Sequence, residues 1–227
     1  MAILAAMLMP ALNKARERAR AASCLNQLKQ VNQAIFSYLD NNEDTFFPYW
    51  DNKDAGKPNM VRVLVSGSYI LPKMFMCPGN PRREPAITNR FTTVDVRYFN
   101  YRTGNGTQMD LYPDYGYNFT YLGRTNGVIG SKPRKITSIR KPSQMIVLGE
   151  SALTGLLTHG SHLLRASYST SSLGILIMRH EKNINIAYAD GHAASVISQA
   201  QSLPPYSSAE NPYRYAPFNQ TSTWQGI

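Results

Sequence analysis

Residues 2–30 read AILAAMLMPALNKARERARAASCLNQLKQ, and this stretch sets the expectation for the whole chain. An uncharged apolar segment, Met1–Leu12, is followed by basic residues between Lys14 and Arg20. Apolar residues then recur at helical spacing, namely Leu25, Leu28, Val31, Ile35 and Leu39. The pattern predicts one long helix from about Ile3 to about Leu39, bent at Pro10 and ended by the polar run Asp40–Asn42.

The apolar end of this helix is unusual for a helix that packs only on its own domain. Its apolar residues, Ile3, Leu4, Met7, Leu8 and Met9, cover all faces, so we expect them to be buried in protein or lipid. Twelve residues are too few to span a bilayer, which needs about 20. No basic residue precedes them, as one would in a secretory signal. With the basic residues that follow, the segment is typical of the lower part of a membrane anchor.

The composition favours a folded chain whose positive charge is dispersed. Hydrophobic residues make up 43% and the net charge is +10, which excludes wholesale disorder and raises nucleic acid or anionic membranes as partners. The densest basic run lacks helical spacing and interleaved aromatics, so it favours a solvated loop leading into a strand, with no nucleic-acid partner. The run consists of Lys132, Arg134, Lys135, Arg140 and Lys141.

A hairpin is predicted near the C-terminal end. Asp190-Gly191 separates two strand-like runs, 185–189 and 192–197, and favours a two-residue type I′ turn in which both residues have positive φ. Ile184, Ile186 and Tyr188 should share one face of the first strand, opposite Ala187 and Ala189. The segment 173–178 should be the preceding antiparallel strand.

Weaker signals predict further elements in the middle of the chain. Residues 58–66 favour a short helix that starts with proline in its first turn. Residues 91–101 and 117–121 favour short strands, the second within a glycine-rich loop over 102–130. Residues 144–148 favour a buried strand.

No catalytic constellation stands out. His180 and Asp190 should lie at opposite ends of the strand 184–189, roughly 20 Å apart, so they could not share a metal or relay a proton. His192 with Asp190 is a weak metal signal, and no nucleophile triad or metalloprotease helix is present. We therefore predict no catalytic residue, no cofactor and no metal site. A hydrolase that uses one of the four histidines is the enzymatic alternative, which two histidines near a carboxylate in a cleft would favour.

Several blocks, in order along the chain, resemble prepilin-type proteins, the type IV pilins and pseudopilins. The helix of residues 2–30 resembles their N-terminal helix, and the resemblance is strongest to the group with a C-terminal signature of His, nine residues and Asp-Gly, here His180, Asp190 and Gly191. Further blocks are NNEDTFFPYW (41–50), GSYILPKMFMCPGNP (67–81), KITSIRKPSQMIVLGES (135–151) and RHEKNINIAYADGHAAS (179–195). Together the blocks cover about half of the chain.

The resemblance implies an α+β, pilin-like fold in which a long N-terminal helix packs on an antiparallel β-sheet. Residues 1–44 would form the helix, and residues 45–227 a globular domain with an extended tail from Leu203. The implied function is a pseudopilin or pilin-like subunit of a type II secretion or type IV pilus-like filament. Its partners would be other subunits, the assembly machinery and the bacterial inner membrane, with the globular domain in the periplasm or at the cell surface. The helix residues involved would be Ile3, Leu4, Met7, Leu8 and Pro10.

In that family a leader and further apolar residues precede the equivalent of Ala2. The resemblance thus implies that this sequence begins about halfway along the anchor, as a shortened piece or at an internal Met, and that as given it is soluble. It also places Cys24 and Cys77 outside the cytoplasm, where a disulfide could persist; two buried free thiols are the alternative. A calcium ion in a loop, as in some major pseudopilins, stays open. The alternative function is a cell-surface adhesin or glycan-binding module, which a row of exposed tyrosines would favour.

Overall fold

The structure is a computed structural model that describes residues 2–48, 59–80, 113–123, 132–153, 160–164, 174–180 and 183–197. Side chains are described from residue 8 onward, apart from those of residues 153 and 197. The predicted strands of residues 91–101, the tail from Leu203 and the side chains of Ile3, Leu4 and Met7 lie outside the described part.

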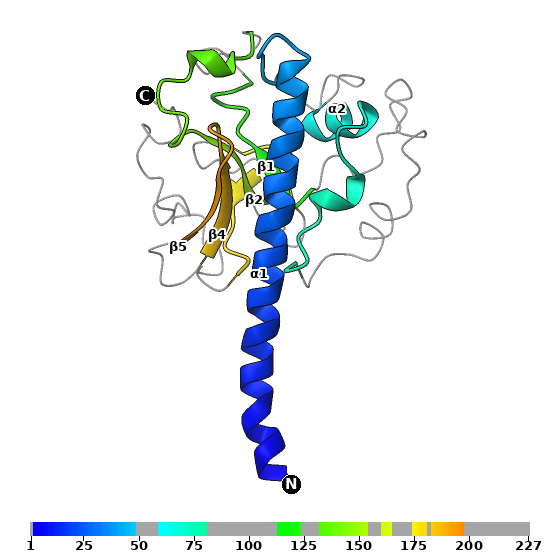
Figure 1. Cartoon of the computed structure of the whole chain (residues 1–227), viewed down its shortest axis with the longest axis vertical. Helices are drawn as coiled ribbons and strands as arrows, with labels where there is room; N and C mark the ends of the chain where they lie inside the picture. Colours follow the sequence, from blue (N-terminus) through cyan, green and yellow to red (C-terminus); the bar gives the residue numbers. More distant parts are fainter. Residues whose placement is uncertain are drawn as a thin grey trace.

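A single helix dominates the molecule, as predicted. Helix α1 (Ala2–Asp40) has 39 residues, continues through Pro10 and ends where the polar run begins. In Figure 1 its second half lies across the globular body and its first half projects from it. The predicted stripe is buried at Leu28, Val31, Ile35 and Leu39, whereas Leu25 is half-buried. In the part of the chain that the structure describes, no helix is long and apolar enough to cross a membrane.

The body is built on an antiparallel sheet, so the α+β class is confirmed. The strands are β1 (Tyr115–Tyr117), β2 (Ile146–Leu153), β3 (Gly174–Leu176), β4 (Asn183–Tyr188) and β5 (Ala193–Ile197). Four of them follow the order β1-β2-β4-β5, and β3 pairs with the far end of β2. The predicted antiparallel strand within residues 173–178 is therefore present as the shorter β3, and its partner is β2.

The two faces of the sheet support two hydrophobic clusters. One contains the buried stripe of α1, with residues of the short helix α2 (Met60–Ser66) and of the 3-10 helix η1 (Pro72–Phe75). The other contains Ile184, Ile186 and Tyr188 of β4, while Ala187 and Ala189 belong to the first. This alternation confirms the predicted faces of β4 and places the helix on the alanine side.

A β-bulge interrupts β2 where it pairs with β4. Ile146 pairs with Tyr188 and Leu148 with Ala187, so one extra residue of β2 lies between two consecutive positions of β4. Val147 and Leu148 both join the cluster under α1, whereas Ile146 joins the opposite one. The bulge therefore resets the alternation, and the side chain two residues after Leu148 points toward α1.

The turn between β4 and β5 differs from the prediction. Only Gly191 has a positive φ, of 94°, and Asp190 does not. The Gly191 N–H donates to the Tyr188 carbonyl at 3.0 Å, and the Tyr188 N–H donates to the His192 carbonyl at 2.9 Å. These bonds enclose a three-residue loop that ends in a glycine with left-handed backbone conformation. A carboxylate oxygen of Asp190 accepts a hydrogen bond from the His192 N–H at 3.1 Å, and this bond holds the Asp190 backbone outside the left-handed region.

Three other elements begin or end at a residue other than the predicted one. Helix α2 begins at Met60, because the Asn59 side chain caps it by accepting from the Arg62 N–H at 3.0 Å, so proline is not its first residue. The strand expected over 117–121 ends at Tyr117, where the chain turns. The strand expected to end at residue 148 continues to Leu153.

Candidate functional site

Two features of the described structure could carry function, and the first is the projecting part of α1. From residue 8 to residue 20 every side chain is exposed except Glu17, which is half-buried. Leu8, Met9 and Leu12 are 67%, 65% and 51% exposed. An apolar helix end of this kind would lose unfavourable contact with water if another apolar surface covered it.

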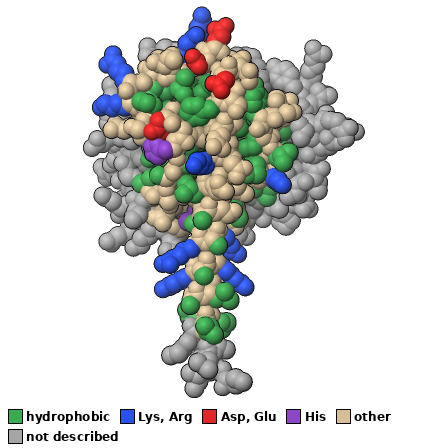
Figure 2. All heavy atoms as spheres, in the orientation of Figure 1, with side chains coloured by type: hydrophobic (Ala, Val, Ile, Leu, Met, Phe, Trp, Pro, Cys, Tyr) green, Lys and Arg blue, Asp and Glu red, His purple; other side chains and the backbone are tan. Residues whose placement is uncertain are grey.

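A basic collar lies between this apolar end and the body. Its members are Lys14, Arg16, Arg18 and Arg20. Figure 2 shows basic side chains spreading to both sides of the helix just below the body. Arg20 forms a 2.5 Å ion pair with Glu17, which neutralises one of the four charges. The remaining positive charge faces solvent and is available to an anionic surface.

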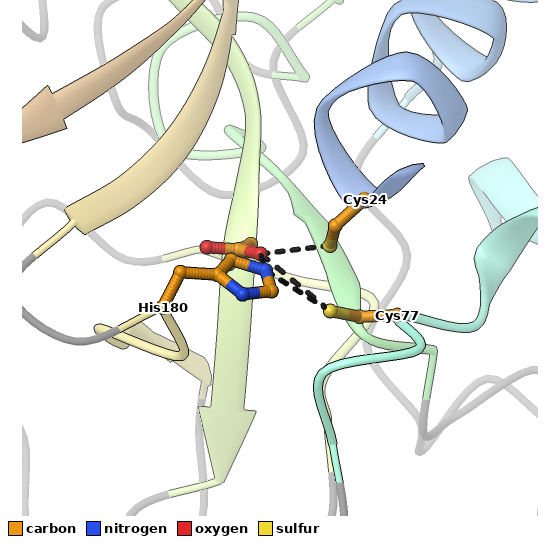
Figure 3. A group of neighbouring side chains, drawn as sticks. Cys24, Cys77 and His180 are labelled. Carbon is orange, nitrogen blue, oxygen red and sulfur yellow. Dashed lines mark hydrogen bonds and ion pairs between the residues drawn. The ribbon is translucent and has the colours of Figure 1, made fainter. Parts of the chain in front are cut away.

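The second feature is a buried cluster of four side chains that can bind a metal, Cys24, Cys77, Glu150 and His180. All four are at most 4% exposed. They come from α1, the loop after η1, β2 and the segment before β4, and Figure 3 shows the two cysteines and the histidine pointing toward one another. Among the helix side chains that the structure describes, Cys24 is the first that is fully buried, so the cluster lies where this part of α1 enters the body.

The four ligand atoms lie within 4.8 Å of one another. Glu150 Oε1 is 2.8 Å from Cys24 Sγ and 2.8 Å from His180 Nε2. Cys77 Sγ is 3.6 Å from the same oxygen and 3.5 Å from His180 Nε2. The arrangement is a buried pair of an imidazole and a carboxyl group with two cysteine sulfurs against it.

Neighbouring groups hold the cluster in place. The Asn185 N–H donates to Glu150 Oε2 at 3.0 Å, and the Tyr115 hydroxyl lies 3.0 Å from Cys24 Sγ. On the other side, the Gly79 N–H donates to Cys77 Sγ at 3.3 Å. These contacts orient the ligating side chains from three different segments.

A buried ion pair anchors the Cys77 loop to the sheet. Asp114 Oδ2 accepts from the Cys77 N–H at 2.6 Å, and Oδ1 accepts from the Asn80 amide at 3.0 Å. Arg179, next to His180, pairs with Asp114 at 3.2 Å and donates to the Ser151 carbonyl at 2.5 Å. The loop and the histidine segment therefore share one anchor.

The electrostatics of the cluster follow from its burial. Burial, with the Cys77 hydrogen bond and the Glu150 charge, raises the pKa of Cys24. Burial would also raise the pKa of Cys77, but hydrogen bonds with Cys24 and His180 lower it to about 7. Burial disfavours the imidazolium of His180, yet hydrogen bonds with Cys77 and Glu150 raise its pKa to about 10. A cation at this position is thus stabilised by the surrounding acceptors.

Close packing by Gly79 completes the site. A Cβ built on Gly79 would lie 2.3 Å from Cε1 of His180 and 2.9 Å from its Nδ1. Any side chain there would have to displace the imidazole. The glycine of the Cys-Pro-Gly sequence is therefore required by the position of the histidine ring.

The structure places the predicted signature residues at separate sites, as expected. His180 precedes β4 and contacts Glu150, whereas Asp190 follows β4 and pairs with His192 at 2.5 Å. Each of these two histidines has its own carboxylate, and the described residues contain no group of two histidines and a carboxylate within ligand distance, which would favour a hydrolase. Cys24 and Cys77 are buried free thiols that lie next to each other.

Sequence reasoning missed Glu150 and therefore the cluster. The buried strand predicted over residues 144–148 ends two positions before Glu150. A carboxylate that continues an apolar strand is the signal that could have found it, because such a charge is buried only with a partner. The prediction of no metal site considered Asp190 and His192, and not the combination of both cysteines with His180.

Comparisons of the chain with protein-family models, with curated proteins and with solved structures found no match.

Proposed function

We propose that this chain is a pilin-like structural subunit, a pseudopilin or pilin of a type II secretion or type IV pilus-like filament. The observation that carries the proposal is helix α1, which packs its second half into the body and extends its first half away from it. The fold implied by the resemblance has this division of one helix between body and filament. The order of the resembling sequence blocks supports the same assignment.

The exposed apolar side chains explain how subunits would associate. Covering Leu8, Met9 and Leu12 with neighbouring helices would contribute about 1.5–3 kcal/mol for each fully buried side chain. The basic collar would then lie at the anionic surface of the inner membrane during assembly. In this proposal the partners are other subunits of the same kind, the assembly machinery and the membrane.

The alternative of a tyrosine-rich binding face receives no support from the described residues. Tyr115, Tyr117 and Tyr188 are buried, and the tyrosines at positions 38, 69 and 121 are half-buried. The buried rings serve the core, so they are not available to bind a glycan. Filament assembly is therefore the function that we propose.

The test compares two changes of charge on the same helix. The protein is expressed from its natural gene in its own cells, either with Leu8→Lys and Leu12→Lys together or with Gln33→Lys as the matched control. Gln33 is exposed on the half of α1 that packs on the body, so the control adds a positive charge without removing the exposed apolar surface. Filaments are collected by shearing and examined by immunolabelling and electron microscopy.

We expect the double-lysine variant to be stable but absent from sheared filaments, and the Gln33→Lys variant to assemble as the unchanged protein does. Circular dichroism and melting temperature of the purified variants check that the body is folded. Assembly of the double-lysine variant at the normal level would contradict the proposal. So would the absence of any multimeric form of the unchanged protein under conditions in which it is expressed.

A further inference from the structure

The buried cluster brings together the donor atoms of a tetrahedral metal site. Zinc is bound by thiolate sulfur, imidazole nitrogen and carboxylate oxygen at about 2.0–2.3 Å, which places the ligand atoms about 3.3–3.8 Å apart. Cys77 Sγ already has this spacing from His180 Nε2 and from Glu150 Oε1, at 3.5 Å and 3.6 Å. The two 2.8 Å contacts of Glu150 Oε1 would have to lengthen by only about 0.5–0.7 Å.

A single carboxylate oxygen is overcrowded when no cation is bound. Cys24 Sγ, Cys77 Sγ, His180 Nε2 and Asn185 Nδ2 all lie within 3.6 Å of Glu150 Oε1. A carboxylate oxygen offers about two lone-pair sites, so it cannot satisfy four donors. A cation placed among these atoms would turn the thiols and the imidazole from competing donors into ligands.

We propose that Cys24, Cys77, Glu150 and His180 form a zinc-binding site. The two sulfurs exclude calcium, which takes only oxygen ligands. A disulfide between the cysteines would use the sulfurs but would give no role to the imidazole nitrogen beside Cys77. It would also give no role to the N–H that Gly79 donates to the same sulfur, a contact that stabilises a thiolate.

The site is structural in character. Four protein ligands complete a tetrahedron, and all four are buried, so no coordination position is left for substrate. The protons of the thiols and of the imidazolium would leave to solvent when the metal binds. The metal would join α1 to the η1 loop, to β2 and to the segment before β4, at the point where the helix enters the body.

The test measures zinc binding by the purified chain. The protein is reduced with a phosphine, stripped with a chelator under anaerobic conditions and titrated with Zn²⁺. We expect one zinc per chain by elemental analysis and a higher melting temperature for the loaded protein, because binding to the folded state stabilises it. Titration with Co²⁺ should give an ultraviolet thiolate-to-cobalt band and the visible bands of tetrahedral cobalt.

Matched variants assign the metal to the cluster. Cys77→Ser and His180→Gln should weaken binding by about tenfold or more. His192→Gln is the control, because it changes a histidine of the exposed Asp190 pair and should leave the stoichiometry and affinity unchanged. The cobalt spectrum of the unchanged protein gives an answer even if a cluster variant fails to fold.

Three results would overturn the proposal. The first is a folded, reduced chain that takes up no zinc. The second is zinc uptake that persists in both cluster variants, or a cobalt spectrum without thiolate bands, since the metal would then lie elsewhere. The third is mass spectrometry showing a Cys24–Cys77 disulfide in metal-free protein isolated from its own cells.

Discussion

His180 Nε2 lies 2.8 Å from Glu150 Oε1, with both side chains at most 2% exposed. The imidazole comes from the segment before β4 and the carboxylate from β2, so their contact links two segments of the sheet. A second histidine–carboxylate pair, His192 with Asp190, lies 2.5 Å apart but is exposed. The molecule thus contains a buried and an exposed version of the same interaction.

The first prediction compares these two pairs in the metal-free protein. Glu150→Ala should lower the free energy of unfolding by about 3–5 kcal/mol, because it leaves a buried imidazolium without its partner. Asp190→Ala should cost at most about 1 kcal/mol, because water screens the exposed pair. Urea denaturation followed by circular dichroism measures both values. Equal costs would show that the Glu150 pair is not buried as the structure has it.

The second prediction concerns the contact between Gly79 and the histidine ring. Gly79→Ala should destabilise the protein by about 1–3 kcal/mol, because its Cβ would lie 2.3 Å from His180 Cε1. In a His180→Ala background the ring is absent, so the same change should cost much less. A double-mutant cycle measures this coupling. If the destabilising effects of the two substitutions simply add, Gly79→Ala lowers stability for a reason other than contact with the histidine ring.

The third prediction concerns the turn between β4 and β5. Gly191→Val should cost about 1–2 kcal/mol, because Gly191 has a φ of 94° that a β-branched residue adopts with strain. For a chain of this size, that corresponds to a fall in melting temperature of several degrees. Asp190→Asn should be nearly silent, because an amide oxygen can still accept from the His192 N–H. Scanning calorimetry of both variants tests the pair, and a large loss of stability for Asp190→Asn would show that the turn needs the charge of Asp190 and not only its acceptor oxygen.

The fourth prediction concerns pH. Slight desolvation would raise the pKa of Asp190, but hydrogen bonds from the His192 side chain and N–H lower it below its ordinary value. Because the folded-state pKa is the lower one, this contribution to stability is present above about pH 4 and is lost as the pH falls through the folded-state pKa. Carboxyl NMR titration should show a higher Asp190 pKa in His192→Gln. An unchanged pKa would mean that the imidazole does not interact with the carboxylate in solution.

The sequence predicted those elements whose signals are local. The apolar stripe of α1 and the polar run after Leu39 predicted the helix and its end, because helix periodicity and termination depend on neighbouring residues. The alternation of Ile184, Ile186 and Tyr188 likewise predicted the two faces of β4. The predicted turn type was wrong, because the hydrogen bond from the His192 N–H to the Asp190 side chain favours a three-residue loop over a two-residue one.

The buried cluster could not be predicted in the same way. Its members are separated by long stretches of sequence, and only the pairing of β2 with β4 brings Glu150 near Asn185 and the histidine segment. The sequence allows the two cysteines to be paired, but nothing local in it indicates that a histidine and a carboxylate approach the same point. The pairing of strands that are distant in sequence, rather than the residue types, brings these side chains together.

The register of β2 beyond its bulge determines where the Glu150 side chain points. Removing Gly149, which lies between Leu148 and Glu150, would leave every ligand in the sequence yet turn the Glu150 side chain to the face away from α1. The carboxylate would then enter the cluster of Ile184 and Ile186, and the two thiols would lose their shared oxygen. Related chains can therefore vary the identity of the residues in this segment more freely than the number of residues in it. An insertion or deletion here would detach the buried cluster from the sheet even where the strands still pair.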